Sequence, residues 1–438
     1  MGCGQVAEIR RTLQCVALFA FAAVLGAAGC SQSRGAPAAV RGDWPMYQLH
    51  ADHNAVVPRA RFSPKWTFDA GAKINGGLAI ADDTMYLDTL AGDVVALDLA
   101  TGKQRWKTHF DNMVMTTPVL ADGRVVVGTG RNAQAEGSGA FAYANDSPNA
   151  LALWGRPEGD HVVALDAATG AKVWSYRTIG EDMPSPAAIA GKIVFANGDQ
   201  HAYALDAATG QAVWRTDLNG VSTMASALIA NADTVVVSVC RDFAGKSETD
   251  ALNVTTGRIV WRSLGGNCDS SPTSDGKRIY LGGVQGATTS YGYGGRSTIN
   301  VVDARTGRRL WTFADGGAGP YTAVGSSERA IAGVWDGAYY QSFPTSNAMV
   351  ALDAAGHLLW RTKTMAPVKM SAVSTGGRLY FGDTAGLFYI VDTRDGHLVQ
   401  TKIFDQPFAT APPIVDGQSL FVADGSTVHA IPLEVRGR

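Results

Sequence analysis

One phrase recurs along the chain and constrains its fold more strongly than any other feature. Residues 162–174 read VVALDAATGAKVW, in which apolar and other positions alternate before an Asp, a turn and a second short stretch that ends in Trp. This pattern predicts a β-hairpin. Each Trp ring can bury roughly 150–250 Å², which one hairpin cannot cover, so the copies must stack against one another. Further copies end at Trp106, Trp214, Trp261, Trp311 and Trp360, and a degenerate copy ends at Gln400.

The spacing of the copies predicts the number of strands in each unit. Trp174 and Trp214 are 40 residues apart, as are Trp360 and Gln400. A period of about 40 residues fits one four-stranded blade of a β-propeller. Upstream segments such as 270–282, SSPTSDGKRIYLG, supply the first two strands with an Asp-Gly turn between them.

The two ends of the chain each carry part of a blade. Segment 63–68 is a Trp-bearing fourth strand with no blade before it, and 427–431 is a third strand with no fourth strand after it. Pairing the two completes an eighth blade and removes two exposed sheet edges. The sequence therefore predicts an all-β fold, an eight-bladed β-propeller of four-stranded antiparallel blades. The tryptophans expected to dock between blades are Trp66, Trp106, Trp174, Trp214, Trp261, Trp311 and Trp360.

The N-terminal residues predict export. Two arginines precede an apolar run that is too short to span a bilayer comfortably, and small residues lead to Cys30. This stretch is similar to a bacterial lipobox, in which Cys30 becomes the lipidated first residue of the mature chain. The alternative is an ordinary signal peptide in which Cys30 is incidental. We divide the chain into a lipoprotein signal peptide at 1–29, a flexible tether at 30–42 and the propeller at 43–438.

Charge and cysteine content limit which kinds of partner are expected and bear on whether the protein contains a disulfide. Only 17% of the residues are charged and the formal net charge is -2, which argues against a nucleic-acid partner. Apart from Cys30, only Cys240 and Cys268 remain after the signal peptide. An exported protein can keep a disulfide. Spacing alone does not decide between a Cys240–Cys268 disulfide and two separate buried thiols.

Four extended connections are predicted to lie on one side of the ring. We place 129–160, 241–249, 284–297 and 335–347 between the second and third strands of their blades. In an up-and-down blade these connections share a side with the links between blades, opposite the uniform Asp- and Gly-containing turns. Loops that grow on one side of a rigid scaffold are where function usually lies.

These loops and the links between blades supply the candidate residues of a ligand or partner face. Aromatic and Arg side chains suit a flat ligand or a protein partner, and carboxylates with a carboxamide near the axis suit calcium. The alternatives are that the rings cover the hydrophobic rim and that Asp and Asn cap turns. No catalytic residue and no complete set of metal ligands can be assigned. The candidates are Arg131, Trp154, Arg156, Glu181, Asp182, Asn267, Asp269, Tyr291, Tyr293, Arg296, Trp335, Asp336 and Tyr339.

The repeat A-x-D-x-x-T-G-x-x-x-W resembles the tryptophan-docking repeat of pyrroloquinoline-quinone-type propellers. The resemblance covers roughly residues 43 to 435. That superfamily contains the quinoprotein alcohol dehydrogenases and the BamB-like lipoproteins of outer-membrane assembly. Because the repeat serves packing in every member, the resemblance implies the fold more directly than the function.

Three functions remain open at this point. The favoured one is a non-catalytic scaffold or binding lipoprotein resembling BamB. It would be a monomer on the periplasmic side, lipid-anchored to the outer membrane, with periplasmic or barrel-assembly proteins as partners. The second is a quinone-dependent dehydrogenase of alcohols or sugars, with pyrroloquinoline quinone and calcium as cofactors. The adjacent cysteine pair and haem-attachment motif that such a resemblance would imply are missing from the sequence. The third is a sugar- or peptide-binding propeller.

Overall fold

The computed structural model describes most of the chain from residue 56 onward. The described residues are 56–57, 66–132, 160–178, 182–240, 247–268, 270–285, 296–314, 331–335, 338–343, 347–417 and 419–433. For 56–57, 131–132, 284–285, 296–297 and 331–335 it describes the backbone alone. All of these residues belong to the compact unit that begins at Val40. Among them no helix is long and apolar enough to cross a membrane. The predicted signal peptide, Cys30 and the tether lie outside the described residues.

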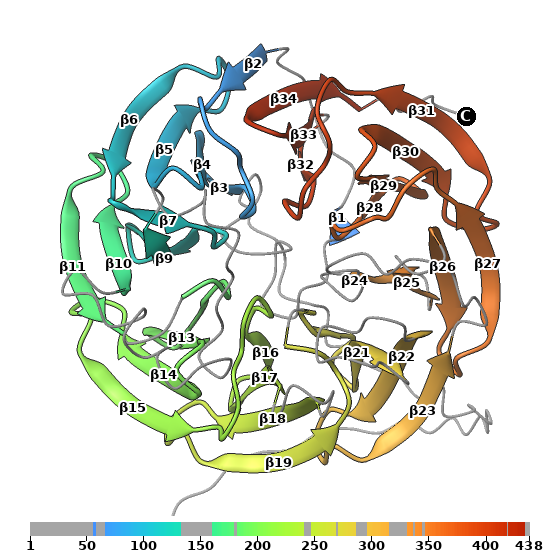
Figure 1. Ribbon diagram of the computed structural model, residues 1–438, viewed down its shortest axis with the longest axis horizontal. Coiled ribbons are helices and arrows are strands. Elements are labelled where there is room, and N and C mark those ends of the chain that lie inside the picture. The colour runs from blue at the N-terminus through green and yellow to red at the C-terminus, as the bar shows by residue number, and fades with distance from the viewer. Residues whose placement is uncertain are drawn as a thin grey trace, which may run out of the picture. The chain divides into compact units, whose positions relative to one another are not determined.

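Eight antiparallel sheets follow one another around a ring (Figure 1). Blade 1 contains β3 (Ala79–Ala81), β4 (Thr84–Asp88), β5 (Asp93–Asp98) and β6 (Gln104–His109). Blade 2 contains β7 (Asn112–Val114), β8 (Val119–Ala121), β9 (Arg124–Asn132), β10 (His161–Asp166) and β11 (Lys172–Arg177), with β7 and β8 both paired to β9. Blade 3 contains β12 (Ala187–Ile189), β13 (Lys192–Ala196), β14 (His201–Asp206) and β15 (Ala212–Asp217). Blade 4 contains β16 (Leu228–Asn231), β17 (Thr234–Cys240), β18 (Ser247–Asn253) and β19 (Ile259–Leu264).

The second half of the ring repeats this plan. Blade 5 contains β20 (Thr273–Ser274), β21 (Arg278–Gln285), β22 (Arg296–Asp303) and β23 (Arg309–Ala314). Blade 6 contains β24 (Ile331–Trp335), β25 (Ala338–Phe343), β26 (Ala348–Asp353) and β27 (Leu358–Lys363). Blade 7 contains β28 (Val373–Thr375), β29 (Arg378–Gly382), β30 (Leu387–Asp392) and β31 (Leu398–Ile403). Blade 8 contains β32 (Ile414–Asp416), β33 (Ser419–Asp424), β34 (Thr427–Pro432) and, from the start of the chain, β2 (Trp66–Asp69).

The predicted closure of the ring is confirmed. Trp66 pairs with Ala430 and Asp69 with Thr427, so β2 is the outer strand of the blade that the C-terminal strands begin. Figure 1 shows β2 beside β34 on the perimeter. A further pairing was not predicted, because β1 (Val56–Val57) runs parallel to β28 as a fifth strand of blade 7.

The tryptophans dock each outer strand onto the next blade. Six of the seven indole N–H groups, all but that of Trp261, donate to backbone carbonyls of that blade's hairpin turn, for example from Trp214 to Val254 at 2.8 Å and from Trp360 to Thr393 at 2.9 Å. The turn glycine lies directly under the ring, since a Cβ at Gly257 would come within 2.7 Å of Trp214. Each of the seven tryptophans has a turn glycine of the next blade under its ring. The pairs are Trp66–Gly102, Trp106–Gly170, Trp174–Gly210, Trp214–Gly257, Trp261–Gly307, Trp311–Gly356 and Trp360–Gly396.

Small hydroxyl residues link the blades a second time, near the axis. The Gly77 amide donates to Thr117 Oγ1 at 2.9 Å, and the Thr117 amide donates to Ser185 Oγ at 2.7 Å, which joins blades 1, 2 and 3. The Ser226 amide likewise donates to Ser271 Oγ at 2.9 Å. These groups are buried, so each hydroxyl satisfies a backbone donor that would otherwise lack a partner.

Three of the four extended connections lie where the sequence placed them. The second strands of blades 2, 4 and 5 end at Asn132, Cys240 and Gln285, and their third strands begin at His161, Ser247 and Arg296. We call the side on which second strands end and third strands begin the loop face. The opposite side, on which the Asp-x-x-Thr-Gly turns join third to fourth strands, is the turn face.

The prediction of a single loop over 335–347 is wrong. Trp335 pairs with Ala338 in the β24–β25 hairpin, so this segment contains the turn between the first and second strands, on the turn face. Tyr339 lies within β25, is 1% exposed and stacks on Tyr280 of blade 5 with ring centroids 4.3 Å apart. Tyr339 is thus a core residue and not part of a ligand face. The error arose because the residues of β25 were taken for part of a loop.

Candidate functional site

Few of the predicted face residues fall within the described part of the loop face. Asp182 and Asn267 are described in full, whereas Arg131 in β9 and Arg296 in β22 are described by backbone alone. Trp335 ends β24 on the turn face, so it does not join them. The remaining predicted residues lie outside the described ranges: Trp154, Arg156, Glu181, Asp269, Tyr291, Tyr293 and Asp336.

Asp182 is a buried carboxyl on the link between blades 2 and 3. It is 2% exposed, and its two oxygens accept hydrogen bonds from Thr178, at the start of the same link, and from Asn197 Nδ2 of blade 3 at 2.9 Å. Burial raises the pKa of Asp182 well above its ordinary value, and the nearby Asp160 raises it further, although the Thr178 hydrogen bond opposes the shift. A carboxyl whose two oxygens already accept hydrogen bonds has less capacity left to bind a hard cation. The group instead ties two blades together.

Asn267 and the two cysteines form the corresponding link between blades 4 and 5. Cys240 at the end of β17 and Cys268 form a disulfide with a Cα–Cα distance of 5.2 Å, which answers the question that spacing left open. The amides of Met224 and Ala225 donate to the Cys268 carbonyl at 3.0 and 2.8 Å. Asn267 is 4% exposed, and its backbone carbonyl accepts a hydrogen bond from the Ser270 amide at 3.0 Å.

A cluster of methionines lies among the same links and was not predicted. Met113 and Met115 come from the link into blade 2, Met183 from the link into blade 3 and Met224 from the link into blade 4. All four are at most 9% exposed. Each of the last three precedes the small hydroxyl residues of its link, in MTTP, MPSP and MASA. That recurrence could have identified the cluster from the sequence. The four flexible side chains form a buried apolar cluster.

A group of polar and aromatic side chains lies farther from the axis on the loop-face half of blade 3. Tyr203 donates to Asp199, His201 contacts the Asp199 carbonyl through Nδ1 at 2.8 Å, and Arg215 lies 5.7 Å from the Tyr203 ring centroid. Burial raises the pKa of the Tyr203 hydroxyl, and the Asp199 carboxylate raises it further. Tyr176 of blade 2 contacts the same ring edge-on. We call Tyr176, Asp199, His201, Tyr203 and Arg215 the blade-3 patch.

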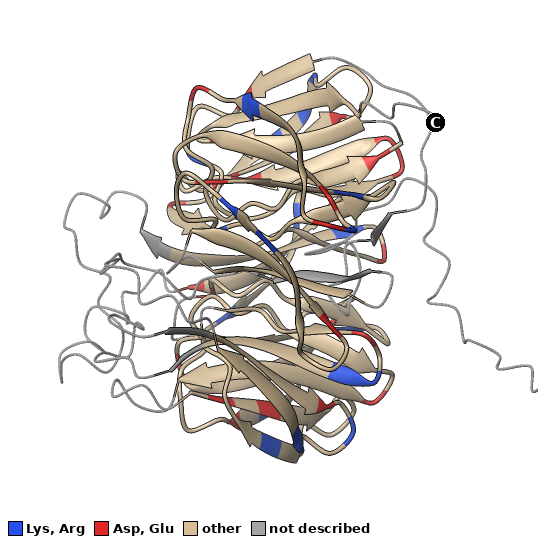
Figure 2. Cartoon of the chain, turned by 90° about the vertical axis from the view of Figure 1, so that its right-hand side faces the viewer, with Lys and Arg blue, Asp and Glu red and all other residues tan. Residues whose placement is uncertain are grey.

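The described loop face carries polar and aromatic side chains of mixed charge. Among the described residues no group of three or more His, Cys, Asp or Glu could hold a metal ion. Asp182 and Asn267 enter different blades, and both side-chain oxygens of Asp182 already accept hydrogen bonds. Basic and acidic residues are interspersed along the described blades in Figure 2, without a surface of one sign. The blade-3 patch combines Tyr, His and Arg, the residue types that anchor protein interfaces.

Comparison with known proteins covers nearly all of the ring. The profile of the family described as outer membrane protein assembly factor BamB matches residues 63–198, 158–292, 198–369 and 345–434. The outer membrane protein assembly factor BamB of Shigella dysenteriae is 27% identical over 393 residues, covering 85% of this chain and 89% of that protein. A tetrathionate hydrolase of Acidithiobacillus ferrooxidans is 24% identical over 376 residues, covering 82% of this chain and 72% of that protein.

A solved structure of an enzyme shares the fold. The quinohemoprotein alcohol dehydrogenase of Comamonas testosteroni superimposes with a TM-score of 0.67, covering 91% of this chain and 82% of that chain. The sequence identity is 14%. At that level the likeness concerns the arrangement of blades and carries no information about activity.

Proposed function

Because the chain belongs to the family of the outer membrane protein assembly factor BamB, we propose that it is a non-catalytic docking scaffold. On this proposal it holds a partner protein on its loop face. The protein would act on the exported side of the cell as a monomer, with components of outer-membrane assembly as partners. Cys30 would carry the lipid that keeps it at the outer membrane.

Two observations together carry this proposal. The family match extends over nearly the whole ring, and the loop-face residue Asp182 is already hydrogen-bonded within the scaffold. The match with the Shigella dysenteriae relative reaches 89% of that protein, so the two chains share a whole ring. On this chain's loop face, the candidate ligand Asp182 is used up in joining blades, with Thr178 and Asn197 as partners. Because Asp182 stabilises the scaffold, we expect a partner protein to bind at the outer surface of the loop face.

The blade-3 patch provides the chemistry for such docking. The Arg215 side chain is exposed while its guanidinium lies over Tyr203, and His201 keeps 23% of its side-chain surface. Arg and Tyr that are held in place by neighbours lose little entropy when a partner covers them. The patch therefore suits a partner segment that offers a carboxylate and an apolar side chain.

The test is recovery of partners by crosslinking in cells that carry matched variants. Arg215→Glu reverses a charge on the loop face, and Arg258→Glu makes the same change in an exposed turn on the turn face. We expect Arg215→Glu to lower the yield of crosslinked outer-membrane assembly proteins at least tenfold and Arg258→Glu to leave it unchanged. Equal recovery from both variants, or equal loss, would contradict a loop-face docking site.

The alternative enzymatic functions need a separate assay on the same purified protein. We expect no turnover of alcohols or aldose sugars with pyrroloquinoline quinone and calcium, and none of tetrathionate. Saturable turnover in either assay would replace the scaffold by an enzyme. Saturable binding of a sugar without turnover would instead favour a sugar-binding propeller.

The lipid anchor has its own test. Cys30→Ser should release the protein from the membrane fraction into the soluble periplasmic fraction, with the propeller still folded. If the variant stays in the membrane fraction, Cys30 is not the anchor.

A further inference from the structure

The first described strand of the chain lies on the inner edge of the ring. β1 pairs with β28, the first and innermost strand of blade 7, and it also contacts β24, the first strand of blade 6. Figure 1 shows β1 towards the middle of the ring, whereas β2, the next strand of the chain, lies on the perimeter. The chain is therefore held near the axis before it takes its place in blade 8.

The parallel pairing fixes the direction of β1. Val56 pairs with Ser374 and Val57 with Thr375, so β1 runs in the same direction as β28. A first strand follows the link between two blades and precedes the turn to the second strand, and it therefore runs from the loop face to the turn face. Val57 lies beside the β28–β29 turn on the turn-face side. The chain consequently enters β1 from the loop-face side.

A chain that led directly into β2 would enter the ring from the opposite side. Trp66 pairs with Ala430 and Asp69 with Thr427, so β2 is antiparallel to the third strand of blade 8. β2 therefore runs from the turn face to the loop face, and a segment joined directly to Trp66 would come from the turn face. The two-residue strand β1 thus reverses the side from which the N-terminal part of the chain reaches the ring.

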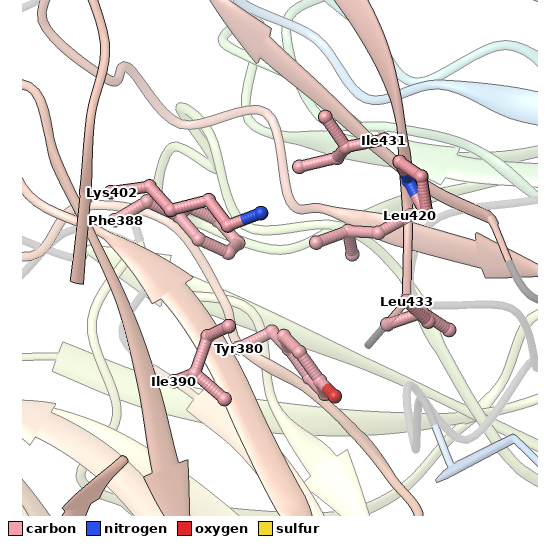
Figure 3. Close-up of a pocket in the computed structure, with 8 residues that line it drawn as sticks. Tyr380, Phe388, Ile390, Lys402, Leu420, Ile431 and Leu433 are labelled. Carbon is pink, nitrogen blue, oxygen red and sulfur yellow. The ribbon is translucent and has the colours of Figure 1, made fainter. Parts of the chain in front are cut away.

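The two blades that hold β1 and β2 are packed against each other. Tyr380 and Ile390 of blade 7 and Leu420 and Leu433 of blade 8 belong to one apolar cluster and are at most 8% exposed. Figure 3 shows these side chains on the two sides of the boundary between the blades. Because the blades are joined through this cluster, the position of β1 on blade 7 is fixed relative to β2 on blade 8.

We propose that β1 turns the loop face toward the membrane, so that a partner protein held at the membrane surface can bind there. The inference rests on the proposed lipid anchor and loop-face docking, and it adds which side of the ring faces the lipid. A lipid on Cys30 is connected to the ring through Val56, and hence from the loop-face side. To reach a membrane on the turn-face side, the chain must return across the strands of blade 7 and along one of them, roughly 30 Å. A flexible tether of about 13 residues, the length predicted at 30–42, spans about 20 Å on average, which favours the loop-face side.

The test compares fluorescent labels on the two faces of the ring at a membrane. The chain from Ser31 onward, with a hexahistidine tag in place of the lipid, is bound to vesicles that contain a nickel-chelating lipid and a lipid with a nitroxide headgroup. Met365→Cys carries the label on the link between blades 6 and 7, on the loop face, and Ala208→Cys carries it in a turn of blade 3, on the turn face. Both positions are exposed. We expect the nitroxide to quench the loop-face label at least threefold more strongly than the turn-face label.

Variants in β1 test whether this strand sets the orientation. Val56→Pro combined with Val57→Pro removes two backbone N–H groups from the pairing with β28 and should abolish the difference in quenching between the two labels. Val56→Gly combined with Val57→Gly serves as the second variant if the proline variant does not fold. Ala38→Pro combined with Ala39→Pro makes the same change in the predicted tether and should leave the difference unchanged.

Three results would overturn the proposal. These are equal quenching of the two labels, stronger quenching of the turn-face label, or a difference that persists in the folded β1 variants. Because the tag replaces the lipid, none of these results depends on Cys30, whose role is tested separately by Cys30→Ser. Arg215→Glu should lower partner crosslinking without changing the quenching of either label. Failure of the docking proposal and failure of the orientation are therefore distinguishable.

Discussion

The joints of the ring differ in how they hold neighbouring blades, and joints 3–4 and 7–8 represent the extremes. At joint 3–4 the Trp214 ring packs on Gly257, its N–H donates to Val254 at 2.8 Å, and Thr216 donates to the Gly257 carbonyl at 2.7 Å. At joint 7–8, Gln400 stands in place of the Trp and no hairpin turn faces it. The repeat therefore encodes contacts between blades, and it degenerates at the joint where its partner turn cannot exist.

The largest expected difference between the two joints comes from removing the side chain at the docking position. Trp214→Ala should lower the free energy of unfolding by about 3–5 kcal/mol, because it removes a buried ring and leaves a cavity. Gln400→Ala should change it by less than about 1 kcal/mol, since only a half-buried polar side chain is lost. Urea denaturation followed by tryptophan fluorescence and circular dichroism measures both changes. Similar losses in the two variants would mean that residue 400 is a docking residue after all.

At joint 4–5 the docked tryptophan lacks its hydrogen bond, and a disulfide links the two blades. Trp261 sits on Gly307, but its buried Nε1 has no hydrogen-bond partner among the described residues. The Cys240–Cys268 disulfide joins the same two blades near the axis and spans 28 residues. Replacing both cysteines by Ala should lower the free energy of unfolding by about 2–4 kcal/mol.

The reduced wild-type protein is the control for that variant. Its urea midpoint in dithiothreitol should match that of the double Ala variant without reductant. A variant as stable as the oxidised protein would show that joint 4–5 does not need the crosslink.

Mutation can distinguish a glycine that supports a docked tryptophan ring from a glycine that only adopts the left-handed backbone conformation. Gly257 has φ +70° and Gly191 has φ +69°, but only at Gly257 would a Cβ collide with a tryptophan ring. Gly191→Ala should lower the free energy of unfolding by about 1 kcal/mol through backbone strain. Gly257→Ala should lower it by about 2–3 kcal/mol, because the ring must also shift. Equal effects would mean that the ring position is not set by the glycine.

The sequence predicts the joints well because their determinants are local in the chain. The Asp, Gly and Trp of each repeat fall within one hairpin, and the shortest spacing of 40 residues, found three times, reveals the blade. Ring closure was predictable because a Trp-bearing strand and a third strand were each left without a partner. The parallel pairing of β1 with β28 involves two residues, Val56 and Val57, whose sequence carries no alternation that could reveal it.

The candidate site was predictable only in part, because the fold determines which of its side chains are buried against neighbours and which are available to a ligand. Tyr339 has the composition of a binding loop, yet its register in β25 places it against Tyr280. Asp182 looked like a metal ligand, but Thr178 and Asn197 reach it from different elements. The blade-3 patch was missed because Tyr176, Tyr203 and Arg215 lie on three strands, and no spacing rule connects them.

Asp182 tests whether the inner end of a docked joint is held by a neutral carboxyl. Its pKa is raised well above the ordinary value of 3.8, first by burial. Below that value the carboxyl is protonated in both the folded and the unfolded chain. As pH rises above 3.8 the unfolded chain ionises first, so the stability that the protonated group provides is lost progressively until pH passes the raised folded pKa. Each pH unit in this window costs about 1.4 kcal/mol of folding free energy.

Asp182→Asn mimics the protonated carboxyl and keeps an oxygen for Asn197 and an amide for Thr178. Relative to the wild type, this variant should gain stability as pH rises from 4 to 8, measured as the urea midpoint. Asp166→Asn is the control, because the pKa of Asp166 is lowered, first by its hydrogen bond from Thr169, and the group is ionised throughout this range. A difference between Asp182→Asn and wild type that stays constant with pH would mean that the Asp182 carboxyl is ionised in the folded protein. The inner end of joint 2–3 would then hold a buried charge, and calcium would again be a candidate ligand for that link.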